Sequence, residues 1–294
     1  MRATELTPEQ KTILITGCSS GIGRYCAISL HKKGYRVFAT ARKAEDVAEL
    51  QALGLTALRL DLNSSDSIKS AVDQILTTTN QQLYALFNNA GFGQPGAVED
   101  LSREAIRAQF ETNVFGLLEL TNALLPIMRR QGYGRIIQNS SVLGLISLPF
   151  RGAYNASKHA LEGLTDTLRL ELNATGIEIS LIEPGPITSN FRANAYQQFL
   201  NNIDQSSSPF RALYASLSKR LSNNLTDPPF TLGPEAVEKA LLHALEAQKP
   251  KARYYVTFPT YMFAVLKRCL PHRLLDRVLL RAAGDEAKQL ITPS

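Results

Sequence analysis

Thr16-Gly17-Cys18-Ser19-Ser20-Gly21-Ile22-Gly23 is the stretch of this 294-residue chain that decides the fold. It follows the apolar run 12–15 and precedes a helical pattern, so a strand, a glycine turn and a helix succeed one another. Glycines permit a tight turn and a close approach of the backbone, and a helix N-terminus offers N–H groups and a positive dipole to a phosphate. The pattern therefore predicts a dinucleotide pyrophosphate site. Its predicted binding residues are Gly17, Ser19, Ser20, Gly21, Ile22 and Gly23.

Short runs rich in Val, Ile and Leu alternate with longer helical patterns along the first two thirds of the chain. The predicted strands lie near 12–16, 35–40, 56–60, 83–88, 134–139 and 177–183. This rhythm is typical of a doubly wound parallel sheet, the Rossmann arrangement, with helices on both faces. With 44% hydrophobic residues the chain is long enough for one large α/β domain. We expect an N-terminal arm over 1–10, a dinucleotide-binding and catalytic core over 11–190, and a substrate-covering segment over 191–294.

A second cluster indicates acid/base chemistry. Tyr154 and Lys158 are four residues apart, which places them on one face of a helix, and Ser141 follows the strand-like run 135–138. A free Tyr hydroxyl has a pKa near ~10, so an acid/base role requires a neighbouring cation. Lys158 could supply that charge, and Ser141 could hold a substrate oxygen against the Tyr hydroxyl. The alternative is an ordinary surface Tyr/Lys pair.

These motifs together resemble the short-chain dehydrogenase/reductase family over roughly residues 11–190. The resemblance implies that Asn113, Ser141, Tyr154 and Lys158 are catalytic, with Asn113 holding a water that links Lys158 to solvent. The further residues that it places around a nicotinamide dinucleotide are Asp61 and Leu62 beside the adenine, then Asn89, Ala90 and Gly91, and finally Pro184, Gly185, Ile187 and Ser189. Ser189 stands where the family usually has Thr. Within the family, the sequence most resembles the retinol and hydroxysteroid dehydrogenases and related bacterial aldehyde reductases.

The end of the second strand predicts the type of dinucleotide. An NAD site typically has an acid there to hold the ribose 2′-hydroxyl. Thr40 takes that position here, and Arg42 and Lys43 follow it. A guanidinium and an ammonium group suit a 2′-phosphate, so NADP is predicted as the cofactor.

The combined prediction is an NADPH-dependent reductase that transfers a hydride between the nicotinamide and an apolar aldehyde or ketone, reversible in principle. Tyr154 would give a proton to the carbonyl oxygen, Ser141 would orient it, and Lys158 would lower the pKa of Tyr154 and bind the nicotinamide ribose. An NAD-dependent alcohol dehydrogenase would use the same residues. A non-catalytic dinucleotide sensor would not need them, and a serine hydrolase is the least favoured of these alternatives.

Composition limits the remaining classes. Three cysteines in a long chain argue against a disulfide framework and for a reducing compartment. The four histidines are scattered, so no metal site is predicted. Residues 1–10 lack the apolar core of a signal peptide, and no run reaches the ~18 apolar residues that span a bilayer. We therefore expect a cytoplasmic protein, with membrane association as an alternative.

The last third of the chain carries the basic charge. Residues 249–281 hold eight Lys or Arg against one acid, whereas the whole chain is only +6. The segment from Pro271 to Arg281 reads as a basic amphipathic helix, which suits a lid over an apolar cleft, a peripheral membrane contact, or a solvated helix packed on the core. Interleaved aliphatics argue against nucleic acid. Residues 192–227 are polar and read as a loop region with one or two helices beside the site.

The segment 113–128 is apolar nearly all round, which predicts burial on every side. Its outer side would meet another subunit, giving the homo-oligomer that the resemblance also implies, or would be covered by the tail of the same chain.

Overall fold

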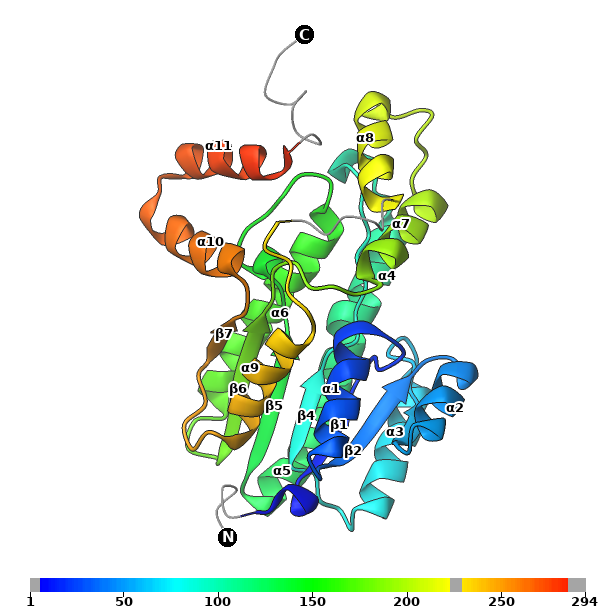
Figure 1. The fold of residues 1–294 in the computed structure, drawn as a ribbon, viewed down its shortest axis with the longest axis vertical. Helices are drawn as coiled ribbons and strands as arrows, with labels where there is room; N and C mark the ends of the chain where they lie inside the picture. Colours follow the sequence, from blue (N-terminus) through cyan, green and yellow to red (C-terminus); the bar gives the residue numbers. More distant parts are fainter. Residues whose placement is uncertain (1–5, 223–228, 285–294) are drawn as a thin grey trace.

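A seven-stranded parallel sheet forms the centre of the molecule (Figure 1). The computed structural model describes residues 6–222 and 229–284. The strands lie in the order β3-β2-β1-β4-β5-β6-β7. Their bounds are β1 Thr12–Ile15, β2 Arg36–Ala41, β3 Thr56–Arg59, β4 Ala85–Asn88, β5 Gly134–Asn139, β6 Ile177–Glu183 and β7 Arg253–Tyr255. The order reverses between β1 and β4, which is where such a fold binds its ligand.

Six of these strands confirm the predicted ones to within two residues, because most of them are short runs that are buried along nearly their whole length. The exception is β3 at the edge of the sheet, where Thr56 and Arg59 are exposed. The sequence reading missed β7, which pairs with β6 at the edge of the sheet. At three residues it is too short for a periodic signal.

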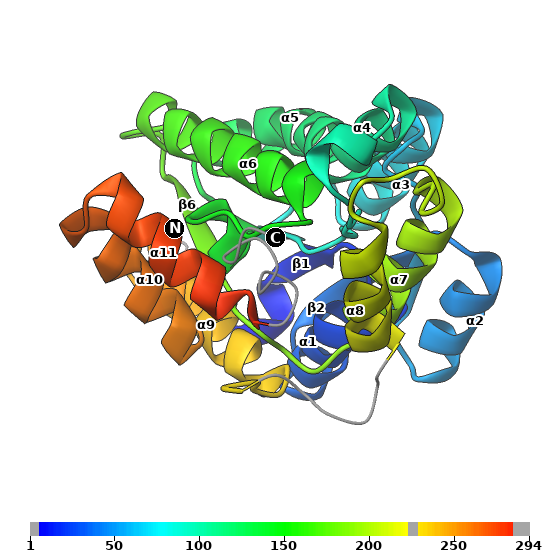
Figure 2. The ribbon, with the colours of Figure 1, turned by 90° about the horizontal axis from the view of Figure 1, so that it is seen from above.

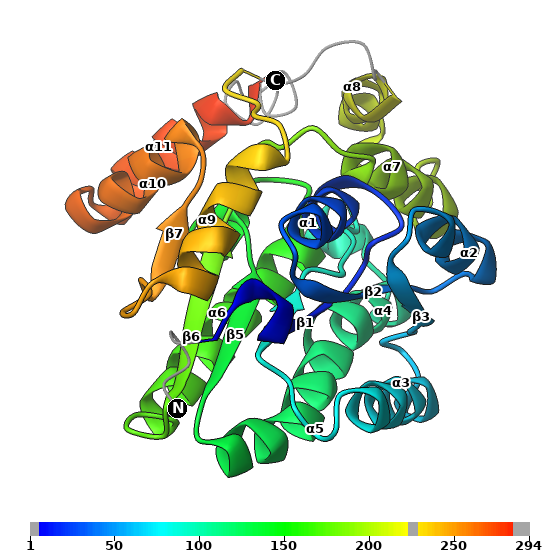
Figure 3. The same ribbon diagram turned by 60° about the horizontal axis from the view of Figure 1, so that its bottom comes forward.

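Helices cover both faces of the sheet (Figure 2). Helices α1, α2 and α9 form one core with the sheet, and α3, α5 and α6 contribute to the other. Figure 3 shows α1 and α9 side by side. The bounds are α1 Gly21–Lys32, α2 Ala44–Ala52, α3 Ser65–Thr78, α4 Arg103–Phe110, α5 Gly116–Gln131, α6 Gly152–Glu171, α7 Phe191–Asn202, α8 Arg211–Ser222, α9 Glu235–Glu246, α10 Phe258–Cys269 and α11 His272–Ala282. Short 3-10 helices span Pro8–Gln10, Val98–Asp100 and Val142–Gly144, and a π-helical turn spans Glu111–Phe115. None of the helices in the described ranges is long and apolar enough to cross a membrane.

Two smaller clusters lie at the end of the sheet towards which the strands point (Figure 1). Helices α7 and α8 pack around Phe199, Tyr214 and Leu217. Helices α10 and α11 pack on the loop after β5, where Phe263 and Leu275 meet Ile146. The predicted loop region 192–227 is thus mostly helical, and its residues 223–227 lie outside the described residues.

The helix around Asn113 differs from the prediction. The π turn joins α4 to α5, and α5 buries most of its large apolar side chains against the sheet. Glu119 and Pro126 are exposed on its outer side, and Phe115 is 51% exposed. Within one copy of the chain this helix is therefore not buried on every side, because one stripe faces outward without cover from the described part of the tail. Cover of that stripe by another subunit stays a prediction.

Candidate active site

The glycine turn after β1 has the shape that close backbone packing requires. Gly17 has a φ of +70°, and a Cβ there would lie 2.7 Å from the Cα atom of Ala90. A Cβ on Gly23 would lie 2.3 Å from the carbonyl oxygen of Gly17. The first helix therefore starts directly against the turn, and a side chain at either position would separate them.

The N-terminus of α1 fits a pyrophosphate. The helix begins at Gly21, and the side chain of its N-cap, Ser20, makes no capping hydrogen bond. The first N–H groups of a helix have no partner within the helix, and no side chain at the cap takes that role here. Ser189 lies against this end, since its Cβ is 3.0 Å from where a Cβ on Gly21 would stand. The site thus combines unpaired N–H groups, a positive dipole and a hydroxyl.

Cations gather where β2 ends. Arg42 and Lys43 are exposed there. Arg59, which the sequence reading did not select, is at the end of β3 and donates from Nε to the carbonyl oxygen of Arg42 at 3.2 Å. Because Ala41 pairs with Arg59 in the parallel sheet, the end of β3 lies beside the end of β2. That pairing is the signal that could have identified Arg59. Thr40 is buried and donates to the carbonyl oxygen of Ile15 at 3.3 Å, so its side chain faces the core rather than a ribose.

Asp61 and Asn89 hydrogen-bond to backbone groups of two turns beside the site. Asp61 accepts a hydrogen bond from the backbone N–H of Asn63 at 3.0 Å, which shapes the turn after β3. The amide group of Asn89 donates to the carbonyl oxygens of Thr16 and Gly17 at 3.0 and 3.2 Å. The Asn89 side chain therefore holds the glycine turn in place, and a contact between this side chain and the dinucleotide stays a prediction. Leu62 is buried beneath the start of α5, and Ala90 and Gly91 line the same end of β4.

The loop after β6 lies over the same end of the sheet. The carbonyl oxygen of Pro184 accepts from the N–H of Val142 at 2.8 Å, which joins this loop to the Ser141 turn. A Cβ on Gly185 would lie 2.1 Å from the hydroxyl of Thr257. Ile187 forms a bridge with Leu232. The predicted closing segment is thus held from three sides.

The predicted catalytic residues lie on three neighbouring elements. Ser141 follows β5, and Tyr154 on the first turns of α6 is hydrogen-bonded to its side chain. Lys158, one turn further, is buried and donates from Nζ to the carbonyl oxygen of Asn139 at 2.7 Å. Asn113 lies in the π turn and donates to the hydroxyl of Ser157 at 3.1 Å. Asn113 therefore braces α6 between Tyr154 and Lys158, and π turns of this kind often mark functional sites.

Burial controls the proton affinities at this site. It raises the pKa of Tyr154 to about 12, while the bond with Ser141 acts in the opposite direction. Burial also lowers the pKa of Lys158 to about 8, against an opposing effect of Glu162. The Nζ atom of Lys158 is 5.7 Å from the centre of the Tyr154 ring. Burial is thus the largest influence on the pKa of Tyr154, and a lowering of that pKa by Lys158 stays a prediction.

A cavity of about 140 Å³ opens beside Tyr154. Phe191 of α7 packs edge-on against the Tyr154 ring with centroids 5.3 Å apart. The other lining residues are Gly93, Gln94, Pro95, Leu143, Arg151, Arg192, Ala195 and Leu221. The sequence reading selected none of the lining residues except Tyr154, since they come from separate loops and helices. Among the described residues no cluster of three or more His, Cys, Asp or Glu could hold a metal ion.

The cover of this cavity comes from α7 and α8 rather than from the basic tail. Leu275 and Leu279, the apolar face of α11, are buried with Phe263 against Ile146. The tail therefore supports the loop that follows Ser141 from outside. Within the predicted covering segment 191–294, the described residues that line the cavity thus belong to α7 and α8, and a lid role for the rest of the tail stays a prediction.

Comparison with known proteins gives the class. The family model described as short chain dehydrogenase matches residues 11–199, and the chain belongs to the short-chain dehydrogenase/reductase family. An uncharacterized oxidoreductase of Escherichia coli strain K12, YbbO, is 46% identical over 270 residues, which are 92% of this chain and 94% of that protein.

Two further relatives widen the comparison. Human retinol dehydrogenase 8 is 37% identical over 83% of this chain and 80% of its own length. The NADPH-dependent 3-dehydrocapnine reductase of Ornithobacterium rhinotracheale is 33% identical over 91% of this chain and 95% of its own. Among solved structures, a short-chain dehydrogenase from Streptomyces avermitilis matches with a TM-score of 0.73 and 29% identity, covering 96% of this chain and 97% of that one. The predicted fold and family are confirmed, and nicotinamide-dinucleotide-dependent oxidoreductase chemistry follows at the level of the family.

Proposed function

We propose that this protein is an NADPH-dependent reductase of apolar aldehydes or ketones. The observation that carries the proposal is the position of the Tyr154 phenol, hydrogen-bonded to the side chain of Ser141 on the wall of a cavity lined largely by apolar side chains. Nicotinamide, when bound, supplies a hydride. Tyr154 donates its proton to the carbonyl oxygen, and Ser141 holds that oxygen in line with the phenol.

The remaining residues position this pair. Lys158 is fixed by its bond to Asn139 and would offer its ammonium group to the ribose on the nicotinamide side. Asn113 keeps the start of α6 in register through Ser157. Alcohol oxidation would use the same residues in reverse, with Tyr154 accepting the proton, and a screen in both directions separates the two.

NADPH is favoured over NADH by the charge at the end of β2. Arg42, Lys43 and Arg59 lie there, and the Thr40 side chain faces the core. The printed name of the Ornithobacterium relative also specifies NADPH. A 2′-phosphate would be neutralised by these cations, whereas a 2′-hydroxyl would find no acid in the Thr40 position.

The cofactor proposal is tested by Arg42→Ala. Loss of a charge-assisted bond of about 1.5–3 kcal/mol should weaken NADPH binding roughly 10- to 150-fold and leave NADH binding nearly unchanged. Arg36→Ala is the matched control, because Arg36 is exposed at the opposite end of β2 and donates to the carbonyl oxygen of Thr78 at 2.9 Å. Equal weakening of both dinucleotides in the Arg42 variant would contradict the proposal.

The substrate class is tested by a carbonyl screen. The cavity of about 140 Å³ is smaller than pockets that enclose drug-sized ligands. We therefore expect higher kcat/KM with short and medium apolar aldehydes than with retinal or steroid ketones, measured by NADPH oxidation. A preference for polar sugars, or no turnover with any carbonyl, would sink this part of the proposal.

We also propose a peripheral contact with anionic membranes, made by α10 rather than α11. Phe258, Tyr261 and Val265 recur on one face of α10 and are 58%, 55% and 59% exposed. The ring of Phe230 contacts that of Phe258 in a tilted arrangement, with centroids 5.1 Å apart. Lys267 and neighbouring basic residues flank this stripe, and an apolar stripe beside cations suits an anionic interface.

Vesicle binding tests the membrane proposal. The protein should cosediment with vesicles rich in phosphatidylglycerol, less with neutral phosphatidylcholine vesicles, and Val265→Glu should reduce binding severalfold. Leu53→Glu is the control, because Leu53 is 48% exposed at the end of α2. Unchanged binding in the Val265 variant would rule out α10 as the contact.

The cysteines are free thiols, which supports the expected reducing, cytoplasmic location.

A second copy of the chain is the proposed partner of the α4–α5 face. Ile106 and Phe115 are 38% and 51% exposed beside a surface hollow of about 640 Å³. Arg107 and Glu111 line the same hollow. A twofold contact could therefore pair Arg107 of each copy with Glu111 of the other. Light scattering should show a dimer or larger assembly that Phe115→Glu disrupts, with Leu53→Glu again as the control. A monomer in the unmodified protein would refute the contact.

A further inference from the structure

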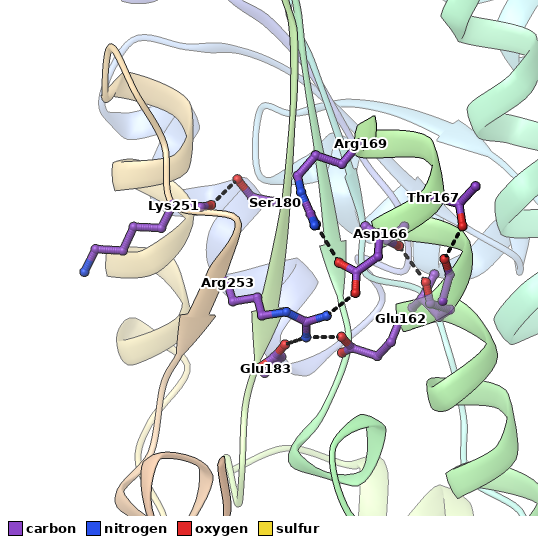
Figure 4. Close-up of polar contacts among 11 residues, drawn as sticks. Glu162, Asp166, Thr167, Arg169, Ser180, Glu183, Lys251 and Arg253 are labelled. Carbon is purple, nitrogen blue, oxygen red and sulfur yellow. Dashed lines mark hydrogen bonds and ion pairs between the residues drawn. The ribbon is translucent and has the colours of Figure 1, made fainter. Parts of the chain in front are cut away.

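Arg253 joins three acidic side chains from two other elements (Figure 4). Its guanidinium group contacts Glu162 and Asp166 on α6 and Glu183 at the end of β6, with 2.6 Å between Nη2 and the Asp166 carboxylate. The side chain of Glu183 is fully buried and that of Glu162 is 8% exposed, whereas Asp166 is 39% exposed. The function proposed above gives this cluster no role.

The two buried carboxyl groups outnumber the one guanidinium that they share. They lie within hydrogen-bonding reach of each other. One oxygen of each, Glu162 Oε1 and Glu183 Oε2, is buried and has no hydrogen-bond donor within the described chain. Two ionised carboxylates can only accept hydrogen bonds, so an attraction between them requires a proton on one. A shared proton also leaves one negative charge opposite Arg253, which is the balanced arrangement for a buried site.

The acid pair contacts the segments that carry the catalytic residues. Glu162 is one turn after Lys158 on α6, and a Cβ on Gly144, in the turn after Ser141, would lie 2.9 Å from the Glu162 carboxyl group. Glu183 directly precedes Pro184, whose carbonyl oxygen binds Val142. The charged and titratable groups around the pair are Lys158 and Asp166 on α6 and Arg253 and Tyr255 on β7. Beyond them, Arg169 pairs with Asp166, and Arg268 acts on Tyr255.

We propose that Glu162 and Glu183 hold one proton between them, clamped by Arg253, and that this pair positions the Tyr154–Lys158 helix against the Pro184 loop. The catalytic part of this inference rests on the proposed function, whereas the shared proton does not. Loss of the proton leaves two adjacent buried anions one turn from Lys158. This change alters both the charge beside the lysine and the fit of α6 against β6.

The pair should make stability depend on pH in a defined direction. Burial and the neighbouring Glu162 raise the pKa of Glu183 to about 8 from an ordinary value of 4.5. A raised folded-state pKa gives stability that is fully present below 4.5 and is lost as pH rises through about 8. One proton bound only by the folded state changes the unfolding equilibrium constant about tenfold per pH unit in this window.

The test is urea unfolding of the full chain at several pH values. Glu183→Gln mimics the protonated acid permanently. The unfolding constant of the unmodified protein, divided by that of this variant, should rise about tenfold per pH unit between about pH 5 and 8. Asp166→Asn is the matched control, because the pKa of Asp166 is lowered by its arginine partners and its contribution changes only in acid. A ratio independent of pH would overturn the proposal.

Two further readouts separate the outcomes. An infrared band of a protonated carboxyl group should be present at pH 6 and lost at pH 9, and its absence at pH 6 refutes the shared proton even if Glu183→Gln fails to fold. In the reductase assay Glu183→Gln should extend the alkaline limb of the kcat profile, while Asp166→Asn leaves it unchanged. An unchanged limb would refute the positioning role. If no carbonyl is reduced, the proposed function fails. The unfolding and infrared results still decide whether Glu162 and Glu183 share a proton.

Discussion

Replacing Arg253 with Met should destabilise the fold severely, because Met spans a similar length without charge. The substitution takes away the guanidinium that Glu162 and Glu183 both contact, and these carboxyl groups are 8% and 0% exposed. Removing one partner of a buried ion pair costs about 3–5 kcal/mol. Asp166 is 39% exposed and adds at most about 1 kcal/mol. The sum is a large share of the roughly 5–15 kcal/mol that stabilises a typical domain.

The loss should grow with pH. At low pH the two carboxyl groups can both take protons, so the cost falls to that of burying neutral acids. At high pH the Glu162 and Glu183 carboxylates are both ionised and lack the guanidinium that would neutralise them. Urea unfolding with linear extrapolation at pH 6 and pH 9 measures both values. Arg169→Met is the control, since Arg169 pairs with Asp166 at 2.5 Å and is 33% exposed. If Arg253→Met costs no more than Arg169→Met at pH 9, the reasoning is refuted.

Three further predictions concern the site. Tyr154→Phe should lower kcat by about 10²–10⁴ with NADPH affinity unchanged, and near-normal turnover would rule out the phenol as the acid. Gly116→Ala should lower Tm and weaken dinucleotide binding in calorimetry, because its Cβ would lie 1.8 Å from the carbonyl oxygen of Leu62. Gly163→Ala is the control: a Cβ there meets nothing within 4 Å, so this change should stabilise the folded protein by about 1 kcal/mol. Phe191→Ala should raise kcat/KM for bulky ketones, and an unchanged substrate range would show that the Phe191 ring, packed on Tyr154, does not limit the cavity.

Local patterns predicted the central sheet and the glycine turn because each depends on neighbouring residues. The run 12–15 and Gly17 need only their own stretch of chain to define a strand and a turn. The same holds for Tyr154 and Lys158, whose spacing on α6 is fixed by the helix. Their relation to Ser141 was predicted from its place after the strand-like run 135–138 and from the family resemblance, and the structure brings Ser141 and Tyr154 together.

Contacts between distant segments could not be predicted in this way. Arg253 and Glu162 are 91 positions apart, and no spacing rule connects them. The amphipathic pattern of 271–281 indicated a buried face but not its partner, which is the loop at Ile146. Phe191 reaches the cavity because the start of α7 lies against Tyr154 of α6 and Gly93 of the loop after β4. Such features need the tertiary arrangement.

Helix α9 has a consequence for synthesis of the protein. Val237 and Leu241 are fully buried in the same core as Ile13 and Ile15 of the first strand. A ribosome therefore completes most of the chain before the first strand acquires its full cover, and Arg253 emerges later still. The nascent chain must keep these apolar strands from aggregating in the meantime, because exposed strands associate readily. We expect the native state to form only after α9 has left the ribosome, so that fragments ending before α9 accumulate as aggregates rather than as a folded dinucleotide-binding half.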